Sequence, residues 1–264
     1  MKKSLFILLL ISTSINAFSQ VKFREGVMWG YKDKKTNAVI IKPKFGYATD
    51  FIDGFAIVSE KPTTPNLRKK MQVINIKGEY ISDSAYESLE NLGQGLFKIG
   101  VLQPLGGYNH GIMDKTGKII IKPELTHVSA ISEGLIILGS GGRYASQYGA
   151  IDTKGNFVIG YQKYVMSDFK CGVSVINMTQ NKGIMTKTGA ILLSPDTSGI
   201  MHIQNFNKNC IAEFRKGNRY GLINAAGKIL VEPIYSRSSG FGDNGVSFYK
   251  DGVTVQYTGT GQKK

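Results

Sequence analysis

The chain has 264 residues, a formal net charge of +14, three histidines and two cysteines. This length is long for one globular core but ordinary for one array of repeats. The positive charge favours anionic partners such as polysaccharides, lipid headgroups or acidic proteins, although many of the lysines stand at turns, where they keep sheet edges soluble. No CxxC, HxH or HExxH spacing occurs, so neither a metal site nor a cofactor is expected.

Residues 1–19 have the three parts of a secretory signal of bacterial style. A lysine pair precedes an apolar run over residues 5–11, and small residues follow. The run is too short to span a bilayer, so no transmembrane segment is expected. Cleavage before Gln20 fits best, and cleavage after Ala17 is the alternative. We therefore expect a cleaved signal peptide and a periplasmic or secreted mature chain that forms a single domain over residues 20–264.

One motif of about 38 residues recurs six times along the mature chain. The segment GIMDKTGKIIIKP at 111–123 returns as GLINAAGKILVEP at 221–233. The glycine that opens the motif, here called the anchor glycine, is found at Gly30, Gly111, Gly149, Gly183 and Gly221, and Gln72 takes its place in the second copy. A second glycine follows about 23 residues later at Gly54, Gly95, Gly134, Gly172 and Gly245, with Cys210 in its place in the fifth copy. Two markers that drift together along the chain indicate internal repetition, as in solenoids and propellers.

Each copy is predicted to contain three short strands, as the first copy illustrates. A strand runs from the anchor glycine to Asp33, and a turn follows. A second, β-branched strand covers residues 39–41 and stops at Pro43, because proline cannot donate a hydrogen bond to the ladder. A third strand covers residues 55–58, after the second glycine. No helical periodicity is found in the mature chain.

The turn after the first strand has a repeated polar residue and a repeated glycine. Its first position holds a short polar side chain, which accepts hydrogen bonds from backbone N–H groups two residues on. These side chains belong to Asp33, Asn75, Asp114, Asp152, Thr186 and Asn224. Three residues later a glycine takes positive φ, except in the first copy, where Asn37 does so one residue further on. This combination predicts a hairpin closed by a type I turn with a glycine bulge.

The first copy carries the motif of a known family. Trp29-Gly30-Tyr31-Lys32-Asp33, followed by Ile40-Ile41-Lys42-Pro43 and Phe51-Ile-Asp-Gly54, resembles the WG repeat. The resemblance covers about residues 26–255, nearly the whole mature chain. The tryptophan occurs once and is replaced in later copies by Met71, His110, Tyr148, Lys182 and Tyr220. The resemblance implies a binding or scaffolding protein of unassigned ligand.

We predict an all-β fold of six three-stranded repeats of about 38 residues, arranged as a propeller-like ring or as an open β-solenoid. Residues 23–30 supply an opening strand, and residues 249–257 are similar to the first strand of a seventh copy. An extra strand at one end completes a ring or caps an open edge. Six copies favour the ring.

Cys171 and Cys210 occupy nearly equivalent places in adjacent copies. An exported chain allows a disulfide to persist. However, one cysteine stands before the second glycine and the other stands in its position. Because an offset of one residue on a strand turns side chains to opposite faces, we favour two buried free thiols over a bridge.

The sequence carries no recognisable catalytic motif. It has no GxSxG elbow and no context for a catalytic cysteine. The segment 139–143 is glycine-rich but lacks the Lys-Ser/Thr pair and the following helix of a phosphate-binding loop. The repeated aspartates are explained as turn residues, so a glycosidase pair is not indicated. We expect no catalytic residue and no enzyme.

Two sets of residues are candidates for binding. Aromatic residues share repeat positions, and packing between copies explains them better than stacking on sugars. They are Trp29, Tyr148 and Tyr220 at one position and Phe45, Tyr86 and Tyr235 at another. Segments that differ between copies are better candidates for ligand contacts; these cover residues 61–70, 103–110 and 139–147. The binding residues selected there are Arg68, Lys69, Lys70, His110 and Arg143, although a packing role is favoured for His110, which stands where other copies carry Trp or Tyr.

The sequence thus predicts an exported, non-catalytic protein that mediates protein interactions at the cell envelope. The alternative is a carbohydrate- or envelope-polymer-binding protein, and a glycan-active enzyme ranks third. The expected partner is a protein or an anionic polymer, and no nucleic acid is expected for an exported chain. Glycan binding requires aromatic side chains in concave pockets, whereas an enzyme requires a pair of acidic groups in a cleft.

Overall fold

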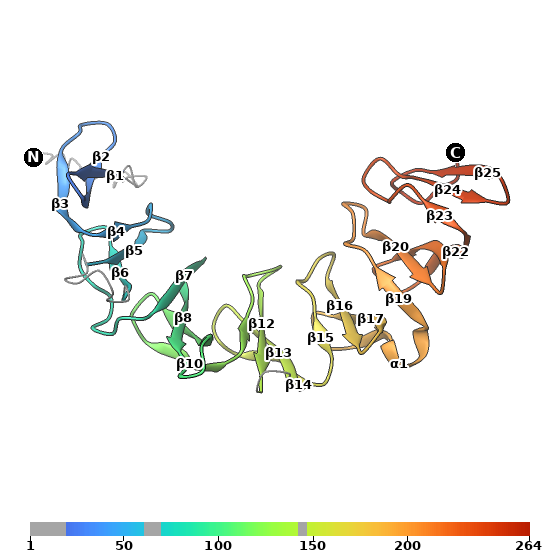
Figure 1. The fold of residues 1–264 in the computed structure, drawn as a ribbon, viewed down its shortest axis with the longest axis horizontal. Helices are drawn as coiled ribbons and strands as arrows, with labels where there is room; N and C mark the ends of the chain where they lie inside the picture. The colour runs from blue at the N-terminus through green and yellow to red at the C-terminus, as the bar shows by residue number, and fades with distance from the viewer. Residues whose placement is uncertain (1–19, 61–69, 142–146) are drawn as a thin grey trace, which may run out of the picture. The chain divides into compact units, whose positions relative to one another are not determined.

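A computed structural model describes residues 20–60, 70–141 and 147–264 (Figure 1). The described chain is built almost entirely of antiparallel β-sheets, which confirms the predicted all-β repeat fold. It divides into two compact units, one ending at Ala85 and the other beginning at Tyr86. Among the described residues, no helix is long and apolar enough to cross a membrane. The predicted signal peptide lies outside the described residues and stays a prediction.

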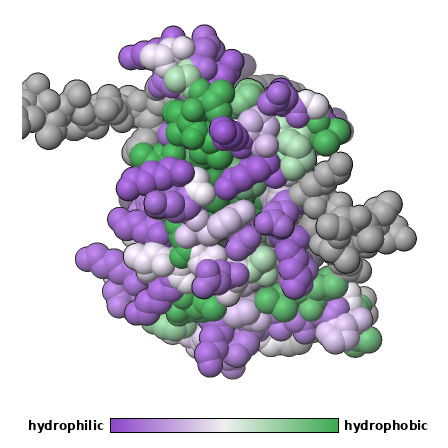
Figure 2. All heavy atoms as spheres, turned by 90° about the vertical axis from the view of Figure 1, so that its left-hand side faces the viewer, coloured by the Kyte–Doolittle hydropathy of each residue, from purple (hydrophilic) through white to green (hydrophobic). Residues whose placement is uncertain are grey.

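The first unit contains two three-stranded sheets. Their strands are β1 (Gln20–Glu25), β2 (Met28–Asp33) and β3 (Val39–Phe45) in one sheet, and β4 (Tyr47–Ala48), β5 (Phe55–Ser59) and β6 (Gln72–Asn75) in the other. Tyr31 and Phe45 from the first sheet and Ile74 from the second are almost fully buried in one apolar cluster. The two sheets therefore pack face to face. On the surface, hydrophilic and hydrophobic side chains are interspersed (Figure 2).

The second unit contains five sheets in chain order. The first two consist of β7 (Ser88–Gly93), β8 (Leu96–Leu102), β9 (Tyr108–Asp114) and β10 (Ile119–Leu125), then β11 (His127–Val128), β12 (Leu135–Ser140), β13 (Gln147–Asp152) and β14 (Phe157–Gln162). The third consists of β15 (Val165–Met166), β16 (Val173–Met178), β17 (Asn181–Thr186) and β18 (Ile191–Leu193). The last two consist of β19 (Ile200–Ile203), β20 (Ile211–Lys216), β21 (Arg219–Asn224) and β22 (Ile229–Tyr235), then β23 (Arg237–Ser238), β24 (Val246–Lys250) and β25 (Val253–Tyr257). Each apolar cluster of this unit joins two successive sheets, so every sheet uses its neighbours to bury its faces.

The sheets are out of phase with the sequence motif. From the second sheet to the sixth, the anchor position lies on the third strand of the sheet, whereas Gly30 lies on β2, the second strand of the first sheet. Among the described residues, each of the six anchor positions lies in a sheet of its own, and one further hairpin belongs to the seventh sheet. The further hairpin follows β25, where Gly261 has a φ of +77° and its N–H bonds to the Thr258 carbonyl at 2.9 Å. The first strand of the seventh copy is therefore β25, which is shorter than the predicted range 249–257, because a turn at Asp251 and Gly252 separates it from β24.

The predicted turns are confirmed in atomic detail. In the third copy the N–H of Gly117 bonds to the carbonyl of Asp114 at 3.0 Å, and Gly117 has a φ of +84°. The Asp114 carboxylate accepts hydrogen bonds from the N–H groups of Thr116 at 2.8 Å and Lys118 at 3.2 Å. These bonds lower the pKa of Asp114 despite the opposing effect of partial burial. The repeated aspartates are therefore occupied as turn residues.

The anchor glycines are required by a close approach of two backbones. A Cβ atom on Gly30 would lie 2.5 Å from the carbonyl oxygen of Ile41 and 2.7 Å from the nitrogen of Pro43, well inside van der Waals contact. The same clash with the neighbouring strand occurs at four further anchors, Gly111, Gly149, Gly183 and Gly221. No side chain fits there, which explains why the glycine recurs.

The prediction that the second strand stops at proline is wrong for three copies. β3 continues through Pro43 to Phe45, and β10 and β22 continue through their prolines in the same way. The register changes at this point, because Tyr31 pairs with Ile41 while Trp29 pairs with Phe45. Proline fits the extra residues of such a bulge, where its missing N–H leaves no gap in the ladder. Only Pro195 follows the end of its strand, and it begins an unexpected helical turn, α1 (Pro195–Ser198).

The turn glycines also contact the preceding sheet. A Cβ on Gly78 would lie 3.0 Å from Cδ1 of Ile41, and a Cβ on Gly189 would lie 3.5 Å from Cγ2 of Ile159. On Gly155 it would overlap with Cγ2 of Ile120. The glycine of one hairpin therefore sits against an outer-strand side chain of the sheet before it. This second constraint on the glycine could not be read from turn chemistry alone.

Candidate functional site

A row of polar and aromatic side chains crosses the sheet of β19 to β22. His202 on β19 pairs with Arg215 on β20, and Arg215 pairs with Tyr220 on β21. Residues directly opposite each other on neighbouring strands point to the same face of a sheet. Tyr220 directly precedes its anchor glycine, so the row lies at the position where the first copy carries Trp29. In that copy the tryptophan ring lies 5.7 Å from Lys22 Nζ and 5.6 Å from the guanidinium carbon of Arg24.

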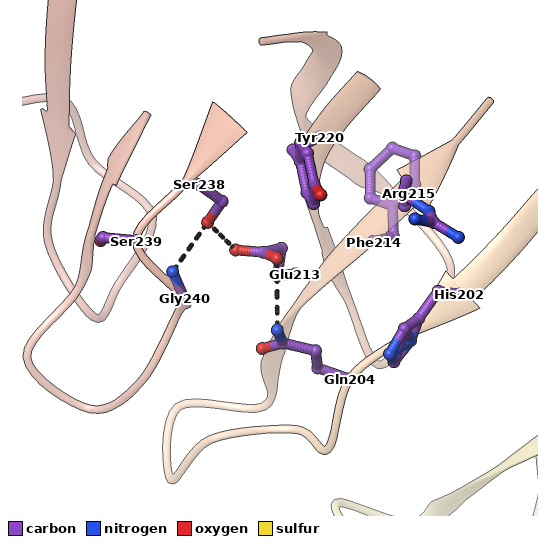
Figure 3. Close-up of a pocket in the computed structure, with 9 residues that line it drawn as sticks. All are labelled: His202, Gln204, Glu213, Phe214, Arg215, Tyr220, Ser238, Ser239 and Gly240. Atoms are coloured by element: carbon purple, nitrogen blue, oxygen red, sulfur yellow. Dashed lines mark hydrogen bonds between the residues drawn. The ribbon is translucent and has the colours of Figure 1, made fainter. Parts of the chain in front are cut away.

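A pocket of about 370 Å³ lies beside this row, where the sheet faces the beginning of the next one (Figure 3). Glu213 stands two residues before Arg215 on β20 and therefore points to the same face. Ser238, on β23 of the next sheet, points toward the Glu213 carboxylate. The full lining consists of His202, Gln204, Glu213, Phe214, Arg215, Tyr220, Ser238, Ser239 and Gly240.

Glu213 is a buried carboxylate, with only 5% of its surface exposed. Gln204 Nε2 donates to Oε1 at 3.2 Å, and the Ser238 hydroxyl donates to Oε2. Burial raises the pKa of Glu213, while the hydrogen bonds from Ser238 and from the backbone of Phe241 offset part of this shift. The Ser238 hydroxyl also accepts a hydrogen bond from the N–H of Gly240 at 2.9 Å. The carboxylate thus ties two neighbouring sheets together at the pocket.

The other side of the pocket is positively charged. Partial burial and the charges of Arg215 and Lys182 lower the pKa of His202. The Nε atom of Arg215 is buried and has no hydrogen-bond partner among the described residues. A buried donor without an acceptor is costly. This side of the pocket therefore favours a ligand atom that accepts hydrogen bonds.

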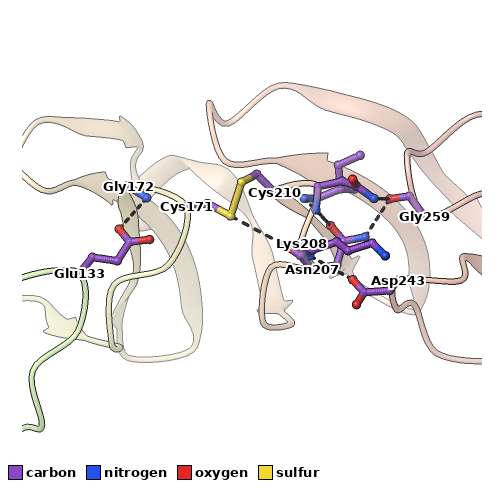
Figure 4. Close-up of a disulfide and its surroundings, with 10 residues drawn as sticks. Glu133, Cys171, Gly172, Asn207, Lys208, Cys210, Asp243 and Gly259 are labelled. Carbon is purple, nitrogen blue, oxygen red and sulfur yellow. Dashed lines mark hydrogen bonds between the residues drawn. A yellow bond between two sulfur atoms is a disulfide. The ribbon is translucent and has the colours of Figure 1, made fainter. Parts of the chain in front are cut away.

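A disulfide ties the sheet that carries the pocket to the sheet before it (Figure 4). Cys171 and Cys210 are bonded, with a Cα–Cα distance of 5.5 Å, which corrects the prediction of two free thiols. The prediction failed because neither residue lies on a strand. Both are in turns, with φ values of +57° and +59°, so the alternation of strand faces does not apply.

Hydrogen bonds link the neighbouring turns in the same way. The N–H of Gly172 donates to the Glu133 carboxylate at 2.9 Å, and the N–H of Lys208 donates to Oδ1 of Asp243 at 3.0 Å (Figure 4). With the disulfide, these contacts connect the last four sheets turn to turn. These contacts hold the two sheets that form the pocket in register.

The histidines of the chain all lie in rows of this kind. His110 pairs with Gly100 on β8, and His127 on β11 pairs with Gly139, which in turn pairs with Tyr148. Partial burial, Lys98 and His127 lower the pKa of His110. Its Nδ1 atom is buried without a partner in the described part of the chain. His110 is thus half-buried at the repeat position where other copies carry Trp or Tyr.

Of the residues selected from the sequence, Lys70 and His110 are described, and neither lines the pocket. Arg68, Lys69 and Arg143 lie outside the described residues. Lys70 is exposed in the first unit. Their role in binding stays a prediction. The packing explanation for the second aromatic set agrees with the structure, because Phe45, Tyr86 and Tyr235 are 1%, 6% and 6% exposed.

Sequence reasoning missed Glu213, although a signal was present. The equivalent residues of three other sheets are aliphatic, namely Ile57, Ile137 and Val175. Those of two further sheets are the lysines Lys22 and Lys98. Glu213 is the one acidic residue at this position among the described copies. An alignment of the six copies with one another would have drawn attention to Glu213.

Glycosidases generally need two carboxyl groups across the scissile bond, whereas Glu213 is the one carboxyl group among the residues that line the pocket. No group of three or more potential metal ligands occurs in the described part of the chain. The chemistry present is a set of hydrogen-bond donors and acceptors, an aromatic ring and a positive side.

Comparison with protein families confirms the resemblance seen in the sequence. The model of the WG containing repeat matches residues 29–61, 111–144 and 220–252. The chain is therefore similar to the WG containing repeat over these three segments. The third match begins at Tyr220 and so includes the aromatic residue of the pocket. No curated protein matches the chain in sequence.

Solved structures are only distantly similar to the chain. A crystal structure of the eukaryotic initiation factor is 9% identical, with 93% of this chain and 72% of that chain covered and a TM-score of 0.45. Hsv2p of Kluyveromyces lactis is 12% identical, with 80% and 74% covered and a TM-score of 0.38. The β-propeller domain of the Trilobed protease from Pyrococcus furiosus is 13% identical, with 90% and 82% covered and a TM-score of 0.34. At this level of similarity none of them carries an argument about function.

Proposed function

We propose that the chain is an exported, non-catalytic interaction protein of the cell envelope, and that its partner, a protein, binds at the Glu213 pocket. The observation that carries the proposal is the pocket itself. Among the described copies, this one holds the only buried carboxylate, Glu213, and a row of His202, Arg215 and Tyr220 lies beside it. Residues that depart from a structural repeat in this way, and that line a hollow together, are suited to recognition.

Two features support export. Residues 1–19 have the composition of a secretory signal. The disulfide between Cys171 and Cys210 is a bond that persists in oxidising compartments and is rare in reducing ones. Cell fractionation together with N-terminal sequencing of the mature protein tests this part, with Gln20 as the expected first residue.

Site-specific photo-crosslinking in living cells tests the binding part. Ser239 is exposed and lines the pocket, so a photoreactive amino acid there reports on its occupant. Gly160, on an outer strand with open space around it, is the matched control position. We expect a discrete crosslinked species from position 239 that is absent from position 160. The same products from both positions would contradict binding at the pocket.

The second candidate is a carbohydrate or envelope-polymer ligand, which the Tyr220 ring and the polar groups beside it favour. Binding of the mature chain to an array of envelope glycans at two salt concentrations distinguishes the candidates. Binding that persists at high salt and is lost in Tyr220→Ala indicates recognition of sugars at the pocket. If charge attraction alone is responsible, salt abolishes the signal, and the protein partner remains the better account.

A further inference from the structure

Exposed apolar side chains recur at the start of the outer strands. In the second unit they form what we call the outer strip, which consists of Ile119, Phe157, Val158, Ile191, Leu192, Ile229 and Leu230. These side chains are between 38% and 51% exposed. They occupy the same place in four successive sheets, immediately after the hairpin turn. A soluble surface tolerates scattered apolar residues, but a set repeated in register marks a contact surface.

The outer strip lies beside the hairpin turns of the following sheets. The turn of each hairpin lies against the outer strand of the preceding sheet. Gly155 meets Ile120, the neighbour of Ile119, and a Cβ on Gly227 would lie 3.7 Å from Cβ of Leu192. A Cβ on Gly261 would lie 3.4 Å from Cδ1 of Leu230. Apolar residues of one sheet and turn residues of the next therefore alternate along the strip.

The turns between the apolar residues carry positive charge. They contain exposed lysines at Lys115, Lys118, Lys154, Lys228 and Lys263. The acidic residues of these turns, Asp114 and Asp152, accept hydrogen bonds from the turn backbone and have lowered pKa values because of such bonds. They are held at the base of the turn. The lysine side chains are thus the free charges of the strip.

We propose that the outer strip docks on the surface of an anionic lipid bilayer. Aliphatic and aromatic side chains enter the boundary between headgroups and acyl chains, while neighbouring lysines pair with anionic headgroups. The charge of the chain complements such a surface. The pattern repeats along four sheets and is not built around a pocket, which suits a continuous fluid surface better than a partner of one fixed shape. This inference goes beyond the proposed function, because it does not involve the Glu213 pocket.

Vesicle sedimentation with the full mature chain tests the inference. We compare phosphatidylcholine vesicles with vesicles that also contain phosphatidylglycerol, at low and high salt. Lys154→Gln with Lys228→Gln removes two charges of the strip, and Lys208→Gln with Lys216→Gln removes two exposed charges of the same unit elsewhere. Phe157→Ser with Leu192→Ser removes apolar contacts at equal charge. Circular dichroism confirms that each variant is folded.

We expect binding to the anionic vesicles, and binding about tenfold weaker or more for the Lys154 and Lys228 pair. The Lys208 and Lys216 pair is expected to bind like the wild type. The serine pair is expected to lose the part of binding that resists high salt. Absence of binding by the wild type, equal losses in both lysine pairs, or unchanged salt resistance in the serine pair would each overturn the proposal. None of these results depends on crosslinking at Ser239, so the two proposals fail separately.

Discussion

At the scale of the residue, the chain separates side chains that maintain the repeat from side chains that are free to differ. The turn aspartates and anchor glycines are fixed by hydrogen bonds and by space. Glu213 is different, because burial opposes its charge and three hydrogen-bond donors only partly offset that cost. Retention of a buried carboxylate under these conditions is typical of a functional position or of a polar contact that fixes two sheets.

The raised pKa of Glu213 predicts a pH dependence of stability. Between its ordinary pKa of 4.5 and the raised value, the folded chain holds a proton that the unfolded chain has released. The contribution of Glu213 to the free energy of unfolding therefore falls as the pH rises through this window, and is constant above it. Urea denaturation at several pH values measures this. Glu213→Gln is expected to lack the fall, and parallel curves for both proteins would contradict the assignment.

The charges around His202 predict a second titration. Because Arg215 lowers the pKa of His202, Arg215→Gln is expected to raise it. NMR titration of the three histidine side chains measures the change directly. Lys228→Gln removes the same charge away from the pocket and serves as the control, for which no change at His202 is expected. An unchanged His202 pKa in Arg215→Gln would mean that the two side chains do not face each other.

At the scale of the element, the hairpin is the part that sequence reasoning predicted best. The polar residue at the first turn position and the glycine after it specify the turn locally, so their chemistry is visible in one copy. The bulge at the proline of the second strand was not predicted. A proline in a sequence indicates the end of a strand unless the partner strand leaves space for extra residues. That space exists only opposite an anchor glycine such as Gly30, which is a property of two strands together.

The anchor position predicts a large effect of a very small substitution. In Gly183→Ala the new methyl group would lie 2.6 Å from Cδ of Pro195 and closer still to the Leu193 carbonyl oxygen. The free energy of unfolding is expected to fall by about 2 kcal/mol or more. Gly160→Ala has open space around the new methyl group and is expected to change it by less than about 0.5 kcal/mol. Equal losses of stability in the two variants, measured by chemical denaturation, would contradict the close approach of the two backbones at Gly183.

At the scale of the whole molecule, the six-copy repeat and the all-β class could be predicted from the sequence, whereas the pairing of Cys171 with Cys210 could not. The repeat is a pattern of many residues, so errors at single positions do not obscure it. The cysteine pairing depends on two left-handed turn residues of successive sheets, whose approach is a tertiary fact. Glu213 and its partners come from three separate segments for the same reason.

The division into two units predicts different responses to reduction. The disulfide closes a loop of 39 residues in the second unit, and its loss is expected to cost about 3–4 kcal/mol. Trp29, the one tryptophan of the chain, lies in the first unit. A reductant is therefore expected to shift the urea transition seen by circular dichroism much more than the one seen by tryptophan fluorescence. Equal shifts in both signals would mean that the units unfold together.

The central claim is that the partner binds at the Glu213 pocket, and the crosslinking yield from position 239 in variant backgrounds tests it most directly. The measurement compares the wild type with Tyr220→Ala, Arg215→Gln and the control Lys228→Gln. We predict that the crosslinked species is lost or strongly reduced in the first two variants and retained in the control. A yield that is the same in all four proteins would contradict the claim.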